Sequence, residues 1–329
     1  MKEILQRLTS HLTLEREEAT NILKKIAGGE YNNSQVSAFL TVYMMRLITV
    51  QELAGFRDAL LDLCLVTDLS EFDTIDLCGT GGDGKNTFNI STASSFIVAG
   101  AGSKVTKHGN YGVSSSCGSS NILEYLGYKF TNNRDILRKQ LDKANICFMH
   151  APLFHPAMKA IAPIRRELSV KTFFNLLGPM VNPSFPHNQL VGVWNLETAR
   201  LYHYIYQQTD KNFTILYSLD GYDEISLTSD FKMISNNEEE LLSPEKIGLS
   251  RVRHEDISGG KTVEESVKIL INILEGKGTE AQTSVVIANS AFALRKLYPT
   301  KNVSECIEMA NDSLQGGSAL KSLKKLLEL

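Results

Sequence analysis

Residues 72–92 read FDTIDLCGTGGDGKNTFNIST and contain four glycines within the six positions 79–84. The short apolar run 72–78 leads into a loop dense in glycine, and a helix of small residues is expected over 92–101. A strand, a glycine loop and a helix in this order favour phosphate, because main-chain N–H groups and the positive end of the helix dipole point at the ligand. Ser91 and Thr92 are predicted to cap the helix start and to add hydroxyl donors. The stretch therefore predicts an anion site within an α/β domain.

Two better-known phosphate motifs nearly fit this loop. The glycines of residues 79–84 have dinucleotide-binding spacing, but that pattern also needs an acidic residue about 20 positions later for the ribose hydroxyl. Residues 85–123 contain no Asp or Glu. The nucleoside triphosphate loop needs Ser or Thr for magnesium where this chain has Asn86. A carboxylate beside phosphates, as at Asp83, is better explained by a ligand that carries ribose, diphosphate and Mg2+ together.

The rest of the chain is predicted to form two domains. Residues 1–66 show leucine and isoleucine at helical spacing, and we expect an all-helical domain at 1–68 for packing or dimerisation. Strands alternating with helices predict an α/β domain at 69–329, with a largely parallel sheet covered on both faces. Further strands are expected at 103–106, 128–130, 147–149, 190–193, 213–218 and 284–287.

The composition bounds the class of protein. The chain has 329 residues, of which 43% are hydrophobic and 22% charged, as in ordinary globular proteins. Its net charge of −3 gives no general affinity for nucleic acid or anionic lipid. We find no signal-peptide stretch and no apolar run near the roughly 18 residues that span a bilayer. The five cysteines form no CxxC pair, which favours reduced thiols and a cytoplasmic location.

A second candidate anion site follows in the sequence. Lys107, His108, Gly109 and Asn110 end an expected strand and run into the serine-rich loop 114–120. A cationic strand end beside many hydroxyl donors can wrap a phosphate. A serine cluster alone is more often a solvated loop, but its place after the glycine loop favours phosphate binding.

Two further segments carry charged residues suited to a binding site. Asp223 and Glu224 follow the expected strand 213–218, and adjacent carboxylates there can share Mg2+ with substrate phosphates. The alternative is an ordinary acidic turn. Arg165 lies in a helical run of the Pro- and Arg-rich stretch 150–182 and can form a bidentate pair with a substrate carboxylate.

Taken in order, these segments resemble the anthranilate phosphoribosyltransferase family over nearly the whole chain. The signatures are Gly79-Thr80-Gly81-Gly82-Asp83, Asn89-Ile90-Ser91-Thr92, Lys107-His108-Gly109-Asn110, His155-Pro156-Ala157-Met158 and Asn175-Leu176-Leu177-Gly178-Pro179. The resemblance implies that the protein forms a homodimer. It also implies that, within each chain, part of 155–185 belongs to the helical domain. It implies transfer of the 5-phosphoribosyl group from phosphoribosyl diphosphate to the amine of anthranilate, in tryptophan biosynthesis.

The resemblance also implies roles for individual residues. Phosphoribosyl diphosphate would be held by Gly79, Gly82, Asp83, Thr87, Asn89, Ser91, Thr92, Lys107 and Ser119. The remaining substrate-binding positions would be Ile90, His108, Gly109 and Ser115. Anthranilate would be held by Asn110 and Arg165, and the expected cofactor, Mg2+, by Ser91, Asp223 and Glu224. Lys107 and Arg165 are the expected catalytic residues.

The chain departs from the family pattern near the second loop. Tyr111 stands where the family commonly has Arg, and Asn121 where it commonly has Asp. The alternative enzyme is a pyrimidine nucleoside phosphorylase, which resembles this family in architecture and phosphate loops and would not need Asp223 and Glu224. A nucleic-acid-binding relative would be expected to carry a basic face, which the net charge argues against.

Overall fold

The computed structural model describes residues 1–112 and 117–329 and divides into two compact units. The smaller, helical unit comprises Met1–Val66 and Ala151–Pro183, and the larger unit comprises Thr67–His150 and Ser184–Leu329. The larger unit contains a mostly parallel sheet flanked by helices. The fold class predicted from the sequence is confirmed. In the described residues, no helix is both long and apolar enough to cross a membrane.

The helical unit is built from two segments of the chain. Its elements are α1 (Lys2–Thr9), α2 (Arg16–Ala27), α3 (Asn33–Met45), α4 (Val50–Asp62), α8 (Ala151–Phe154), α9 (Met158–Leu168), α10 (Phe174–Leu177) and the 3-10 turn η1 (Gly178–Met180). Phe173 from the second segment stacks on Phe56 of α4 with ring centroids 4.4 Å apart. It also meets Phe39 of α3 edge-on at 6.2 Å. The second segment therefore completes the aromatic core of this unit.

A buried carboxylate joins α4 to α3 and to the loop between α1 and α2. Glu52 of α4 accepts hydrogen bonds from Leu14 N (3.0 Å), Tyr43 Oη (3.2 Å) and Arg46 Nη1 (3.0 Å). The N and Oγ1 atoms of Thr49 also donate to it at 3.0 Å, within a capping box at the start of α4. Burial pushes the pKa of Glu52 upward, but these hydrogen bonds outweigh burial and hold the pKa below its usual value.

The larger unit contains a sheet of seven strands in the described residues. They are β1 (Thr74–Gly79), β2 (Lys104–Gly109), β3 (Ile146–His150), β4 (Asn188–Gly192), β5 (Asn212–Ser218), β6 (Phe231–Ser235) and β7 (Glu239–Leu242). The order is β3-β2-β1-β4-β5-β6-β7, with β1 to β5 parallel and β6 and β7 antiparallel. The strand order reverses between β1 and β4, which is where open α/β sheets bind ligands.

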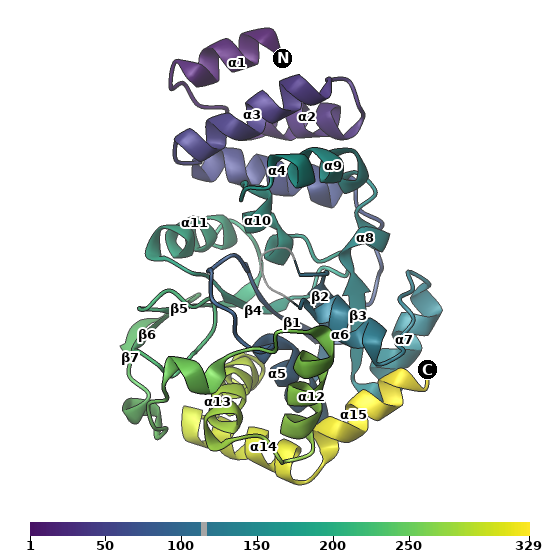
Figure 1. The fold of residues 1–329 in the computed structure, drawn as a ribbon, viewed down its shortest axis with the longest axis vertical. Coiled ribbons are helices and arrows are strands. Elements are labelled where there is room, and N and C mark those ends of the chain that lie inside the picture. Colours follow the sequence, from purple (N-terminus) through teal and green to yellow (C-terminus); the bar gives the residue numbers. More distant parts are fainter. Residues whose placement is uncertain (113–116) are drawn as a thin grey trace. The chain divides into compact units, whose positions relative to one another are not determined.

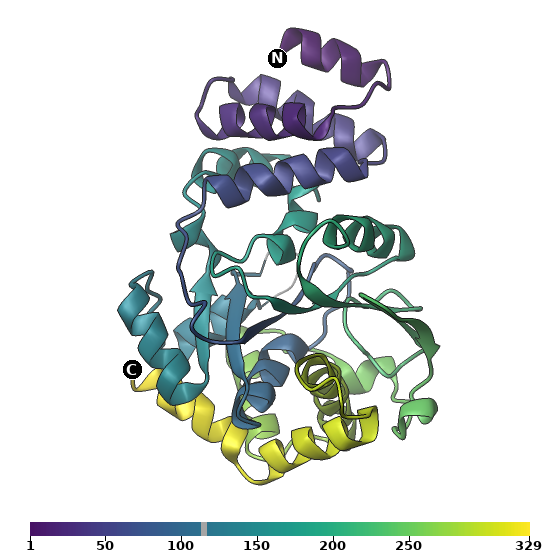
Figure 2. The same ribbon diagram turned by 180° about the vertical axis from the view of Figure 1, so that it is seen from behind.

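Helices cover both faces of this sheet. The α-helices are α5 (Ile90–Gly100), α6 (Ser119–Tyr125), α7 (Arg134–Ala144), α11 (Leu196–Tyr206), α12 (Val263–Leu274), α13 (Glu280–Leu297), α14 (Val303–Gln315) and α15 (Ser318–Leu327). Two 3-10 turns, η2 (Glu245–Ile247) and η3 (His254–Ile257), complete the unit. Helices α5 and α13 lie on one face, and α11 lies on the other in both views (Figure 1 and Figure 2).

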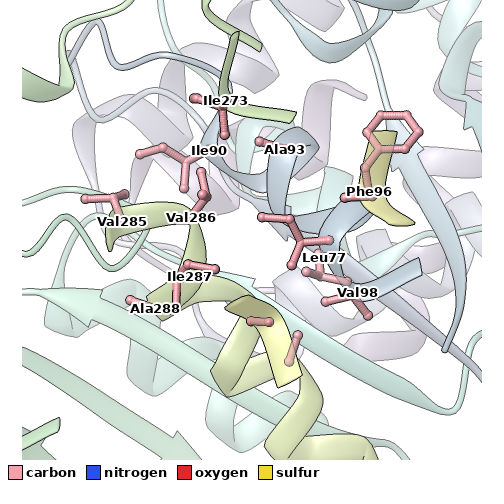
Figure 3. Close-up of a cluster of buried hydrophobic side chains, with 14 of the residues drawn as sticks. Leu77, Ile90, Ala93, Phe96, Val98, Ile273, Val285, Val286, Ile287 and Ala288 are labelled. Carbon is pink, nitrogen blue, oxygen red and sulfur yellow. The ribbon is translucent and has the colours of Figure 1, made fainter. Parts of the chain in front are cut away.

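The main core lies between the sheet and helices α5 and α13. Figure 3 shows Leu77 of β1 beside Val98 of α5, with Val286 and Ile287 of α13 in the same cluster. The small residues of α5 are buried along almost the whole helix, from Ile90 to Ala99. Small side chains let α5 lie close to both the sheet and α13, which fixes the glycine loop that precedes it.

Three local predictions are wrong. Residues 284–287 lie within α13 rather than in a strand, because a short buried run of apolar residues fits either element. Residues 128–130 form no strand, and the aromatic rings there pack instead against β3. Ser91 and Thr92 do not cap α5, because the helix begins at Ile90, with Asn89 at the cap position making no side-chain cap hydrogen bond.

Candidate active site

The carboxyl ends of β1 and β4 meet at the point where the strand order reverses. Gly79 and Gly192 are register partners there, and Thr80 N donates to Gly192 O at 3.0 Å. A Cβ atom on Gly79 would collide with the Asp223 carboxylate, and one on Gly192 with the Asp223 backbone. Glycine at both strand ends therefore lets the turn after β5 lie directly over them.

Acidic side chains from this turn meet the glycine loop. Asp223 Oδ2 accepts from Gly81 N at 2.6 Å, and Glu224 Oε1 accepts from Ser91 N at 3.0 Å. Asp83 lies close enough to Asp223 to interact with it through a hydrogen bond. The three carboxylates thus come from two distant segments, and Glu224 contacts the start of α5.

The electrostatics of these carboxylates favour a cation. Burial, followed by the charge of Asp83, raises the pKa of Asp223 to about 7. Burial and Asp223 raise the pKa of Glu224 well above its usual value, and burial raises the pKa of Asp83. Among the described residues, no three His, Cys, Asp or Glu side chains form a metal-holding group by themselves. These oxygen donors still suit Mg2+, which commonly takes one or two carboxylates and completes its shell with substrate phosphates and water.

Lys107 of β2 lies beside this acidic group. It is 2% exposed, and its Nζ donates to Leu77 O at 2.6 Å and to Ser91 Oγ at 3.3 Å. Burial lowers the pKa of Lys107, while the charges of Asp76 and Glu224 oppose that shift. A buried ammonium group in this position is suited to balance the negative charge of an anion.

The glycine loop has an unusual backbone that is tied to its surroundings. Gly81, Gly82 and Gly84 have φ of 65°, 76° and 76°, a region that other residues rarely adopt. Asp83 Oδ1 accepts from Lys85 N at 2.9 Å, which closes the loop on itself. The shape of the loop therefore requires glycine at these positions.

The far end of the loop is anchored at three places. The Lys85 ammonium group lies 4.7 Å from the centre of the Tyr222 ring, a cation–π contact next to Asp223. Thr87 forms an antiparallel bridge with Ser258. Asn89 Nδ2 donates to Cys117 O at 3.0 Å and thereby links the glycine loop to the loop after β2. Ile90 and Thr92 are buried in α5.

The loop after β2 is held by close backbone contacts. His108 N donates to Asp76 Oδ1 at 3.1 Å, and Ser120 N donates to Asn110 O at 3.1 Å. A Cβ atom on Gly109 would collide with Ser119 Oγ, so glycine brings the start of α6 against the end of β2. Ser115, expected to bind substrate, lies outside the described residues.

Arg165 belongs to the helical unit. It lies on α9, where its Nη2 donates to Asn175 Oδ1 at 3.4 Å and its guanidinium group lies 5.2 Å from the centre of the Phe174 ring. Burial lowers the pKa of Arg165. The adjacent Arg166 is exposed, so Arg165 is the better placed of the two to be held in a fixed position by its neighbours.

Comparisons with known proteins match both units. A model described as "Glycosyl transferase family, a/b domain" matches residues 71–320, and one described as "Glycosyl transferase family, helical bundle domain" matches residues 2–64. The anthranilate phosphoribosyltransferase of Flavobacterium psychrophilum is 60% identical over 329 residues, which cover 100% of this chain and 99% of that protein. The chain belongs to the anthranilate phosphoribosyltransferase family.

Other members of the anthranilate phosphoribosyltransferase family agree over the full length. The Christiangramia forsetii enzyme is 58% identical, covering 100% of this chain and 99% of its own. The Thermus thermophilus structure has a TM-score of 0.89 at 27% identity, covering 98% of both chains. The Saccharomyces cerevisiae structure, in complex with PRPP and Mg, has a TM-score of 0.91 at 26% identity, covering 98% of this chain and 96% of its own. These relatives favour the transferase over the nucleoside phosphorylase alternative.

Three residues that hold the acidic turn in place were not predicted from the sequence. Asn289 of α13 holds both backbone groups of Ile225, accepting from its N at 3.1 Å and donating to its O at 2.9 Å. Ser218 Oγ donates to Glu224 O at 2.6 Å, and Gly192 admits the same turn. Asn289 could have been noticed in the sequence, because it is a polar amide within a long apolar run. No sequence feature distinguishes Gly192 and Ser218 from residues at ordinary strand ends.

Proposed function

We propose that this chain transfers the 5-phosphoribosyl group from phosphoribosyl diphosphate to the amine of anthranilate. The products are N-(5-phosphoribosyl)anthranilate and diphosphate, in a step of tryptophan biosynthesis. Membership of the family over the full length supports this function. The observation that carries it is the meeting of the glycine loop, Lys107, Asp223 and Glu224 at the point where strand order reverses.

The proposed donor site separates two kinds of charge. The positive-φ glycines and the start of α5 offer backbone N–H groups to phosphate oxygens. Lys107 is placed to balance negative charge on the departing diphosphate, because its Nζ is held beside Ser91. Ser91, Asp223 and Glu224 would hold Mg2+, which when bound supplies further charge neutralisation to the leaving group.

The acceptor needs less assistance from the protein. The aniline nitrogen of anthranilate is neutral at pH 7, so attack on C1 of the ribose requires no strong general base. Catalysis then depends on positioning and on stabilising separated charge. We assign the anthranilate carboxylate to Arg165, whose planar guanidinium group matches a carboxylate in bidentate geometry, and assign Asn110 to the same substrate.

We also propose a homodimer that works in the cytoplasm. The helical unit carries apolar side chains that are largely exposed, with Met45 at 82% and Leu47 at 71% exposure, which supports an interface there. The free cysteines at 64, 78, 117, 147 and 306 support a reducing compartment. Light scattering during size-exclusion chromatography tests the dimer, because one chain has a mass of 36.5 kDa. Elution at the single-chain mass at micromolar concentration would refute it.

The function is tested by following anthranilate fluorescence. The purified protein with anthranilate, phosphoribosyl diphosphate and Mg2+ should remove the fluorescence, and omission of phosphoribosyl diphosphate should stop the loss. Incubation with thymidine or uridine and inorganic phosphate should release no free base. Folded protein that leaves anthranilate unchanged but cleaves a pyrimidine nucleoside would replace the proposal with the phosphorylase.

A further inference from the structure

Four residues of the larger unit form a closed circuit around the turn after β2. Ser120 N donates to Asn110 O at 3.1 Å, and Ser120 Oγ lies 2.9 Å from His150 Nδ1. The Tyr111 ring meets the His150 ring edge-on, with centroids 5.1 Å apart and an interplanar angle of 82°. Tyr111 N donates to Asn110 Oδ1 at 2.8 Å and closes the circuit. Asn110 is thus held by its carbonyl from one side and by its amide oxygen from the other.

The circuit is anchored in the core through His150. This residue ends β3, and its ring stacks on Phe130 with centroids 4.1 Å apart and nearly parallel planes. Burial lowers the pKa of His150, and the charge of Glu124 only partly opposes this shift. The imidazole is therefore neutral near pH 7, and its Nδ1 can accept the hydroxyl hydrogen of Ser120.

The outer side of the turn is fixed as well. Tyr111 Oη donates to Glu124 Oε1 of α6 at 3.0 Å, so both the ring and the hydroxyl of Tyr111 have defined contacts. Asn121 Oδ1 accepts from Gly112 N and from Gly118 N, each at 3.0 Å. A Cβ atom on Gly118 would collide with the turn backbone. Residues 110–112 are therefore held between β3 and α6.

Tyr111 contributes both its side chain and its backbone to this arrangement. Its ring packs edge-on against the His150 ring and its hydroxyl donates to Glu124, while its backbone N–H donates to the Asn110 amide oxygen. With Oδ1 bound to Tyr111 N, the Nδ2 group of Asn110 is the donor left to meet a ligand, and Asn110 is exposed.

We propose that Tyr111 and His150 are positioning residues for the acceptor substrate, acting through the circuit that orients Asn110. This inference rests on the proposed function, in which Asn110 binds anthranilate. Neither residue needs to touch the substrate. Loss of the ring contact should loosen the Asn110 amide and weaken anthranilate binding, while the glycine loop that binds phosphoribosyl diphosphate is left in place.

The test compares two variants at Tyr111 with a matched control. Tyr111→Ala should raise KM for anthranilate by about three- to tenfold, the range expected for loss of an edge-on aromatic pair. KM for phosphoribosyl diphosphate and kcat should stay within about twofold. Tyr111→Phe keeps the ring and should restore KM for anthranilate almost fully. Tyr125→Ala removes an exposed tyrosine of α6 and should change neither constant.

A second variant tests whether Tyr111 and His150 act together. His150→Phe keeps an aromatic ring over Phe130 but removes the hydrogen bond to Ser120, and it should also raise KM for anthranilate. The double variant Tyr111→Ala/His150→Phe should raise it less than the product of the single effects, because both act on one circuit.

The outcomes separate the two proposals. An unmodified protein without activity towards anthranilate overturns both the function and the inference. An active protein whose Tyr111→Ala variant keeps its KM for anthranilate, or raises both KM values equally, overturns the inference alone. A variant that is too unstable to assay is replaced by Tyr111→Leu, with thermal melting to confirm folding. If folded Tyr111→Leu keeps its KM for anthranilate, the inference is likewise overturned.

Discussion

Replacing Gly192 with alanine tests the packing that places the acidic turn over the sheet. The new Cβ atom would overlap the carbonyl group of Asp223 and would lie 3.2 Å from Glu224 N. Both obstacles are backbone atoms, so no side-chain rotation relieves the clash. The turn is also held from behind by Asn289, so it must move as a body or lose that anchor.

The expected size of the effect follows from this geometry. Overpacking of a filled site costs about 1–3 kcal/mol of stability, and a shift of about 1 Å in a catalytic group costs about 100-fold in rate. We therefore expect Gly192→Ala to lose about 100-fold in kcat/KM, with a fall of several degrees in Tm. The assay is the initial rate of anthranilate fluorescence loss at several Mg2+ concentrations, together with thermal melting.

Gly28→Ala is the matched control for this experiment. Gly28 lies exposed at the end of α2, and a Cβ atom there would come no closer than 3.4 Å to Lys24 O. This variant should keep full activity. A folded Gly192→Ala protein with activity within threefold of the unmodified chain would refute the reasoning, because the acidic turn would then not need its observed position.

Three further changes have expected outcomes. Lys107→Met keeps an apolar stem but removes the buried charge, so kcat should fall about 100- to 1,000-fold in the fluorescence assay, and a loss below tenfold would contradict its role. Arg165→Ala should weaken anthranilate binding by about 2–5 kcal/mol, seen as a raised KM for anthranilate, and an unchanged KM would refute the assignment. The folded-state pKa of Glu52 is lowered, so its stabilisation is present above its unfolded pKa and is lost as pH falls through the lower folded pKa. Acid melting curves should therefore show lost stability below about pH 4. Glu52→Gln, costing about 3–5 kcal/mol at pH 7, should reduce that loss by the share that Glu52 contributes; an unchanged acid transition would contradict this role.

The glycine loop was predictable because its local chemistry is unusual. A strand, glycines at required positions and a helix of small residues agree on one structure, and Asp83 within the loop indicated the kind of ligand. For Asp223, the sequence predicted only that it follows the end of a strand. Its contact with Gly81 depends on strand order, which a single sequence leaves open.

The structure shows why some secondary-structure predictions were wrong or missing. Residues 284–287 lie within a helix that is buried along most of its length, so its apolar run lacks the alternation that distinguishes a strand from a helix. Residues 128–130 have aromatic residues typical of strands, but Phe130 finds its partner in the His150 ring rather than in a neighbouring strand. The antiparallel strands β6 and β7 were not predicted, since their short polar-edged segments carry a weak pattern.

We propose that this chain joins anthranilate to phosphoribose at the site formed by the glycine loop and the acidic turn. The most direct measurement is the yield of diphosphate and of N-(5-phosphoribosyl)anthranilate from one reaction, the second identified by mass spectrometry. We expect equal amounts of the two products, formed only when anthranilate and phosphoribosyl diphosphate are present together. Diphosphate release without the anthranilate adduct, or no reaction by folded protein with Mg2+, would contradict it.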